Sequence, residues 1–309
     1  HTIGFLVPII YATFNHARLG FTTVGSQRIS APFYYDHTIY GACLAFFIPF
    51  LFNSALRAKH SKTRVFYLLL LIIFMAAAIL SYSRAAWLSL LIAAGINLIL
   101  KNKIKARYLF YGCCIVLLAS VVNWQKIITS LKENKEISHS NNVSMHLKSI
   151  SNVNTDASNK ERINRWKCAL RMFADKPLLG FGPGTYQFFY GQYQQREDLT
   201  RISTFNGTKG HAHSEYLNYL SETGLPGLLI FLSLLSVVCV KCLVVIKKSG
   251  SKEKRNIALF VFTGLITYFI HAFFNGFLEF DKMAMPVFAS FAIVVYLSNT
   301  PDKQKNLSP

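Results

Sequence analysis

Long apolar stretches alternate with short polar segments along most of the chain, and their lengths predict membrane-spanning helices. A spanning helix needs about 20 mostly apolar residues, and eight stretches approach this length. They lie at residues 1–14, 37–53, 65–81, 85–100, 108–124, 225–246, 257–278 and 283–298. The pattern therefore predicts an all-α polytopic membrane protein with about eight transmembrane helices. The first stretch is short and begins without a methionine, so we expect His1 to lie inside a helix of a longer parent chain.

Lysine and arginine gather in three short clusters between these stretches, and their positions predict how the chain is oriented. The clusters lie within residues 54–64, 101–107 and 247–256. Positively charged loops favour the cytoplasmic side of a membrane, and an even number of predicted spans separates each cluster from the next. The segments that then face outward are residues 15–36, 81–84, 125–224 and 279–282.

The predicted topology divides the chain into four parts. Residues 1–124 form a first transmembrane bundle of about five spans, and residues 225–298 form a second bundle of three. Residues 125–224 form a large, partly helical outward loop between the two bundles. Residues 299–309 form a cytoplasmic tail. The loop is the one substantial aqueous region of this arrangement.

Within the loop, the pattern from Ser158 onward predicts an amphipathic helix. Ser158 and Glu161 have the spacing of a capping box, and apolar side chains follow at helical intervals. These are Ile163, Trp166, Leu170 and Phe173. We expect the helix to end before Pro177, and its apolar stripe to rest on the membrane surface or on the ends of the spans. The arginines that this placement leaves available to an anionic group are Arg162, Arg165 and Arg171.

Composition supports a lipid environment and excludes other classes of protein. Apolar residues make up 52% of the chain and charged residues only 15%, with a mean hydropathy of +0.32. Soluble domains carry about 25% charged residues, and a chain with 26 Phe and 15 Tyr is too apolar to be disordered. The net charge of +19 would suggest nucleic acid in a soluble protein, but the basic residues lie between spans, so we expect no such partner. The six cysteines have no disulfide or metal-binding spacing.

Polar side chains at the ends of spans are the first candidates for function, because they are costly to place near lipid. In the predicted topology these side chains gather on the outer side. They are Arg28, Asp36, His37, Arg84, Arg162, Arg165, His211, His213, Glu279 and Asp281. Arg84 lies in a tight turn between two spans, where its guanidinium is either an interfacial anchor or a binding group for a lipid-linked phosphate.

The pair His211 and His213 is compatible with two kinds of chemistry. Two histidines could bind a metal ion, but no nearby cysteine or third histidine completes a site, so we expect no metal. One histidine acting as a general base near neutral pH needs no such set and fits better. The segment 177–184 lacks the full pattern of a phosphate-binding loop, so we expect a turn there.

Three polar residues repeat at four-residue spacing on the predicted span 257–278 and beyond it, namely His271, Asn275 and Glu279. For the first two we expect hydrogen bonds between helices. Glu279 lies near water and is either an accessory site residue or a loop charge.

Several of these segments together resemble one family. From His213 the chain has His-Ser, nine residues, Gly224, two residues and Gly227, preceded by an arginine-bearing helix and the segment 177–184. This order resembles the signature of the O-antigen ligase family, which also includes O-antigen and capsule polymerases. Residues 83–87 look like the family's arginine-bearing turn, and residues 28–49 look like its earlier outward loop and helix. The resemblance covers most of the chain, which looks like the carboxy-terminal two thirds of a complete member.

The resemblance implies an inverting-type, metal-independent glycosyltransferase of the bacterial inner membrane, with no cofactor and its site facing the periplasm. Such an enzyme moves a glycan from undecaprenyl diphosphate to an acceptor hydroxyl, with the lipid A core of lipopolysaccharide as the best-known acceptor. His213 would orient or deprotonate that hydroxyl, with His211 and Glu279 as possible accessory residues. The diphosphate would be bound by Arg28, Arg84, Arg162 and Arg165.

Two alternatives stay open at this point. The closer one is an O-antigen, capsular or exopolysaccharide polymerase, which would use a second lipid-linked glycan as the acceptor. The other is a transporter, but transporters commonly show internal repeats and mid-membrane polar groups, and the sequence has neither feature.

Overall fold

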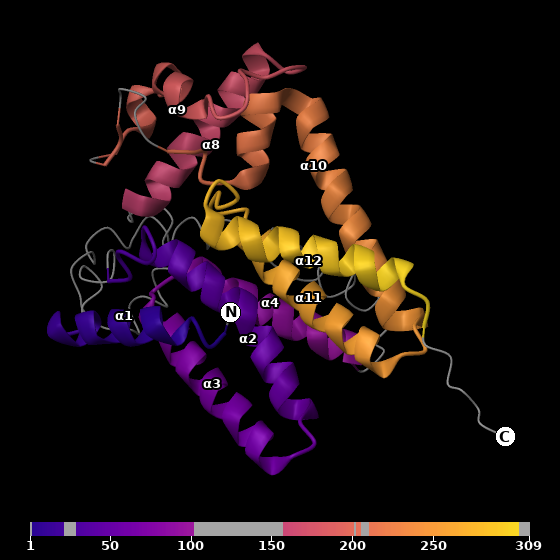
Figure 1. Ribbon diagram of the computed structural model, residues 1–309. Coiled ribbons are helices and arrows are strands. Elements are labelled where there is room, and N and C mark those ends of the chain that lie inside the picture. The colour runs from indigo at the N-terminus through magenta and orange to yellow at the C-terminus, as the bar shows by residue number, and fades with distance from the viewer. Residues whose placement is uncertain (1, 22–28, 102–156, 201, 205–209, 303–309) are drawn as a thin grey trace, which may run out of the picture. The chain divides into compact units, whose positions relative to one another are not determined.

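The computed structural model describes residues 2–21, 29–101, 157–200, 202–204 and 210–302 (Figure 1). The described residues form helices and turns and contain no strand, which confirms the predicted all-α class. The predicted span 108–124 and Arg28 lie outside the described residues. The chain forms two compact units, which we describe separately. Unit 1 comprises residues 1–97 and 229–309, and unit 2 comprises residues 98–228.

Among the described residues, four helices are long and apolar enough to cross a membrane. They are α2 (His37–Arg57), α3 (Ser61–Leu80), α10 (Glu215–Lys248) and α12 (Asp281–Asn299). Three more predicted spans correspond to helices outside this set, namely α1 (Leu6–Arg18), α4 (Arg84–Lys101) and α11 (Lys252–His271). The prediction of a helical membrane protein is confirmed, while the predicted count of eight spans is not.

Helix α2 is the most buried of the candidate spans and is the centre of unit 1, where it packs against α3, α11 and α12. Gly264 on α11 allows a close approach, because a Cβ there would lie 3.0 Å from the carbonyl oxygen of Phe46 on α2. Small residues at such crossings are typical of helix packing in membranes. The Asn97 side chain on α4 also donates a hydrogen bond to Asn53 on α2, at 3.4 Å.

The prediction that His271, Asn275 and Glu279 form a polar stripe along one helix is wrong. Helix α11 ends at His271, and the chain continues through a turn in which the amides of Phe274 and Asn275 both donate to the His271 carbonyl. The sequence Asn275-Gly276 follows at once, and this pair favours turns over helix. Asn275 still hydrogen-bonds to the His271 ring, at 3.1 Å, whereas Glu279 is exposed in the turn before α12.

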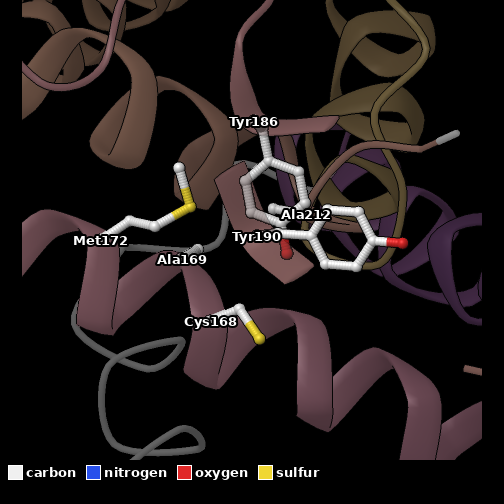
Figure 2. Close-up of a cluster of buried hydrophobic side chains, with 6 residues drawn as sticks. All are labelled: Cys168, Ala169, Met172, Tyr186, Tyr190 and Ala212. Carbon is white, nitrogen blue, oxygen red and sulfur yellow. The ribbon is translucent and has the colours of Figure 1, made fainter. Parts of the chain in front are cut away.

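Unit 2 is organised around α8 (Ala157–Asp175), which ends two residues before Pro177 as the sequence predicts. The short helices α9 (Tyr186–Phe189), η2 (Tyr190–Tyr193) and η3 (Arg196–Asp198) follow. Because the helix already includes Ala157, Ser158 is not the N-cap that the capping-box prediction requires. Figure 2 shows the apolar core of this unit, in which Cys168 and Met172 of α8 lie near the stacked rings of Tyr186 and Tyr190.

The buried face of α8 is not the predicted apolar stripe. Leu170, a member of that stripe, is 49% exposed, whereas Glu161, Asn164 and Arg165 on another face are buried. Each of these three polar side chains has hydrogen-bond partners in later segments of unit 2. A buried polar group is stable when it is hydrogen-bonded, so these partners allow a polar face to turn inward.

Helix α10 contains a sharp kink at Gly224, where the backbone has φ +67° and ψ −169°. This conformation is essentially restricted to glycine. A Cβ on Gly224 would also lie 2.5 Å from the Leu178 carbonyl oxygen and 2.7 Å from that of Pro177. The segment 177–184, which forms a turn as predicted, therefore packs backbone to backbone against the kink.

We expect Gly224→Ala to destabilise unit 2 by more than the roughly 1–3 kcal/mol that its backbone conformation alone costs, because the new methyl group would also overlap backbone atoms. Thermal unfolding of the purified protein in detergent measures the loss. Gly184→Ala is a matched control, since Gly184 also has a positive φ of +74° but has open space around a Cβ. Equal losses in the two variants would contradict the close contact at the kink.

Candidate functional site

His213 is held in an unusual backbone conformation just before α10. Its φ is +51°, a left-handed value that is uncommon for a residue other than glycine. Two hydrogen bonds fix this conformation. The Trp166 indole N–H donates to the His213 carbonyl at 3.2 Å, and the His213 amide donates to Nδ1 of His211 at 3.0 Å. Strained backbone of this kind is concentrated at functional sites, which makes the position of His213 a candidate site.

The environment of His213 keeps its imidazole neutral. The side chain is partly exposed, but its Nδ1 atom is buried and has no hydrogen-bond partner in the part of the chain that the structure describes. Burial lowers the pKa of His213 well below its usual value, and the neighbouring His211 and the positive charges of Arg165 and Arg162 lower it further. A neutral imidazole can accept a proton or a hydrogen bond from a substrate hydroxyl.

Arg165 forms a buried ion pair within α8 and a hydrogen bond to the segment before His213. Its Nε lies 2.9 Å from Oε1 of Glu161, and the two residues are only 6% and 4% exposed. The guanidinium carbon lies 4.5 Å from the centroid of the Tyr190 ring, in the range of a cation–π interaction. The guanidinium also donates to the His211 carbonyl at 3.5 Å. Arg165 therefore links the histidine segment to the core of unit 2.

The sequence leaves Arg165 and Arg171 available to an anion, and in the structure both guanidinium groups also have partners within unit 2. Arg171 donates to the Tyr193 carbonyl and to the side chains of Gln195 and Asp198, at 2.6 to 2.8 Å. The carboxylate partner of Arg165 is Glu161, one helical turn earlier on α8, whereas that of Arg171 is Asp198, which lies 27 residues later in the chain.

Arg162 lies one helical turn before Trp166, and its guanidinium donates to the Asn159 side chain at 3.3 Å. Its charge acts on the His213 imidazole, as the lowered pKa of that histidine indicates. The structure thus brings four of the predicted site residues together in unit 2. These are Arg162, Arg165, His211 and His213.

Glu222 connects α10 to the turn at residues 177–184. One carboxylate oxygen accepts from the Gly184 amide and the other from the Tyr186 amide, both at 2.9 Å. The amide of Gly182 donates to the Glu222 carbonyl at 2.8 Å, and a Cβ on Gly180 would lie 2.3 Å from the Glu222 backbone. This clamp holds the first turns of α10, and hence the residues that follow His213, against the turn.

Arg84 belongs to unit 1, where it is the first residue of α4. The preceding turn is tight, with a positive φ of +50° at Tyr82, and is secured by the Trp87 indole, which donates to the Ala78 carbonyl at 2.8 Å. The N-terminus of a helix carries partial positive charge and disfavours a cation. The Arg84 guanidinium adds its positive charge to that of the helix N-terminus. A bound anion would stabilise these two positive charges together.

The remaining predicted residues are less defined. Arg28 lies outside the described residues, and Glu279 is an exposed residue of unit 1. Within the described ranges, no group of three or more His, Cys, Asp or Glu residues is placed to hold a metal ion.

Three side chains that shape this site were not identified from the sequence, namely Glu161 as an ion-pair partner, Tyr190 and Glu222. The four-residue spacing between Glu161 and Arg165 is typical of an ion pair on a helix. In the sequence, however, the same glutamate also fits a capping box, which is the role predicted for it. The partners of Tyr190 and Glu222 lie 14 to 38 residues away in the chain, so no local spacing indicates them.

Comparison with known proteins adds the family. Residues 66–232 match the model of a family described as O-antigen ligase, and no curated protein matches the sequence. The matched region includes Arg84, the α8 arginines, both histidines of the site and the glycine kink. Since it covers more than half of the chain, this membrane protein belongs to the O-antigen ligase family, whose members carry out glycan transfer of the ligase or polymerase type.

Proposed function

We propose that this protein transfers a glycan from undecaprenyl diphosphate to an acceptor hydroxyl at the periplasmic face of the bacterial inner membrane, with lipid A core as the acceptor. The observation that carries the proposal is the His213 imidazole, which is kept neutral beside two arginines on a strained backbone. The family match supports glycan transfer of this general type.

In this proposal, His213 acts on the acceptor. The acceptor oxygen forms a bond to the anomeric carbon of the glycan while the bond from that carbon to the diphosphate breaks. The hydroxyl proton passes to the neutral imidazole, and the diphosphate leaves with both electrons of the broken bond on its lipid carrier. General-base assistance of this kind contributes about 10²- to 10⁴-fold to a rate.

The departing diphosphate gains negative charge, and arginines are suited to bind it because they donate several hydrogen bonds to phosphate oxygens. We assign this role to Arg84 and Arg162, and include Arg28 from the sequence resemblance. Arg165 contributes positive charge near the site, but its ion pair with Glu161 gives it mainly a positioning role. His211 supports His213 through the hydrogen bond to its amide. Glu279 stays an accessory candidate.

We expect Arg84→Ala to lower transfer by about 10²-fold, the loss that follows removal of one charge-stabilising donor. Arg84→Lys keeps the charge but not the planar pair of donors, so it should retain intermediate activity. The measurement is transfer by purified protein in lipid vesicles, normalised to the amount of inserted protein. Full activity of Arg84→Ala would remove Arg84 from the mechanism.

The assay that tests the function supplies purified protein with a lipid-diphosphate glycan and a panel of acceptors. Transfer to lipid A core supports the ligase proposal, whereas transfer only to a second lipid-linked glycan identifies a polymerase. Because arginines supply the positive charge in this scheme, transfer should continue after divalent cations are chelated. No transfer to any acceptor would contradict the proposed function.

A further inference from the structure

The turn that packs against the α10 kink carries two leucines whose side chains are exposed. Leu178 and Leu179 are 69% and 84% exposed, and they are neighbours in sequence. Their backbone, by contrast, is firmly held. The Pro177 carbonyl accepts from the Leu225 amide at 2.8 Å, and Gly180 packs on the Glu222 backbone. The turn therefore presents apolar side chains on a rigid support.

The position of this turn along α10 fixes its depth relative to a bilayer. Leu225 is the first residue of the apolar run 225–246, and at about 1.5 Å per residue this run rises about 33 Å. The hydrocarbon core of a bilayer is about 30 Å thick. Leu225 therefore lies at one edge of the hydrocarbon, and the hydrogen bond from Leu225 to Pro177 places the turn at the same level.

Exposed apolar side chains continue from the turn onto the helix. Leu225, Leu229 and Ile230 in the first turns of the run are 44%, 53% and 71% exposed, as expected for a span that faces lipid. Beside the turn, the Lys176 ammonium lies 4.4 Å from the centroid of the Phe181 ring. This distance is in the range of a cation–π interaction, which places a positive charge beside the turn.

We propose that the turn at residues 177–180 inserts Leu178 and Leu179 into the bilayer leaflet that Leu225 enters, and so anchors unit 2 to the lipid. A protein partner fits these features less well. A stable interface between proteins buries about 800 Å² on each side, which is far more than two leucines offer. The apolar run of α10, in contrast, begins at Leu225, whose amide is hydrogen-bonded to the turn.

The inference is tested by tryptophan fluorescence of the full chain in vesicles of phosphatidylethanolamine and phosphatidylglycerol. The variant is Leu179→Trp, which should fold because the position is exposed and tolerates a larger side chain. The signal of the unsubstituted protein, which has three Trp, is subtracted. The matched control is Glu197→Trp in η3, since Glu197 is also exposed but polar.

We expect the added tryptophan at position 179 to show a blue-shifted emission maximum and a loss of intensity when the acyl chains carry bromine near the headgroup. The control tryptophan should show neither change. Emission at position 179 that is typical of water and unaffected by brominated lipid would overturn the proposal. A blue shift without quenching by brominated lipid would also overturn it, because protein rather than lipid would then cover the turn.

Discussion

Replacing His213 with alanine is expected to lower glycan transfer by about 10²- to 10⁴-fold, the range for loss of a general base. The variant should still insert and accumulate, since the backbone groups of His213, rather than its ring, make the hydrogen bonds to Trp166 and His211. Transfer in vesicles, divided by the amount of inserted protein, measures the effect. His213→Asn is a second variant, because asparagine adopts the left-handed backbone conformation more readily than alanine does. This variant should also be inactive.

The dependence of glycan transfer on pH distinguishes a catalytic role of His213 from a merely structural one. Because burial and the neighbouring charges lower the pKa of His213, the imidazole stays unprotonated as the pH falls through about 6.5, the usual histidine value. Transfer should therefore persist below that pH and decline only at the lower pKa of the folded protein. Arg162→Gln removes one of those charges, so the decline should begin at a higher pH. A decline centred at the usual histidine value in the unsubstituted protein would contradict the neutral imidazole.

Replacing Glu161 with alanine is expected to destabilise unit 2 by about 3–5 kcal/mol, because it leaves the buried guanidinium of Arg165 without its carboxylate. The same change removes the acceptor for the hydroxyl groups of Thr200 and Ser203. The free energy of local unfolding can be measured by native-state hydrogen exchange at the amides of α8 in the purified protein.

Lys167→Ala is the matched control on the same helix. The Lys167 side chain is 46% exposed and pairs with Asp198, and exposed ion pairs contribute only about 0–1 kcal/mol. The double variant Glu161→Met/Arg165→Met removes both charges and should recover part of the loss seen in Glu161→Ala. If Glu161→Ala cost no more than Lys167→Ala, the Glu161–Arg165 pair would not be the core element that its burial indicates.

The sequence by itself determined the class of this protein. Apolar stretches of spanning length predict helices wherever the chain must satisfy its backbone hydrogen bonds in lipid, and α2, α3, α10 and α12 follow that pattern. Pro177 and Gly224 are equally local signals, because each restricts or permits a backbone conformation regardless of its surroundings. The order of histidine, glycines and upstream arginines indicated the family that the later match identified.

The tertiary structure alone decided which groups each polar side chain meets. Hydrophobic periodicity places Leu170 on the apolar stripe of α8, but it does not show that Glu161 and Arg165 on another face are buried within unit 2. Their partners Ser203 and Tyr190 lie 42 and 25 residues away in the chain. The lowered pKa of His213 likewise results from charges on α8 that only folding brings close. Periodicity depends on neighbours within a few residues, whereas the pairing of buried charges depends on long-range contacts, which a single sequence does not specify.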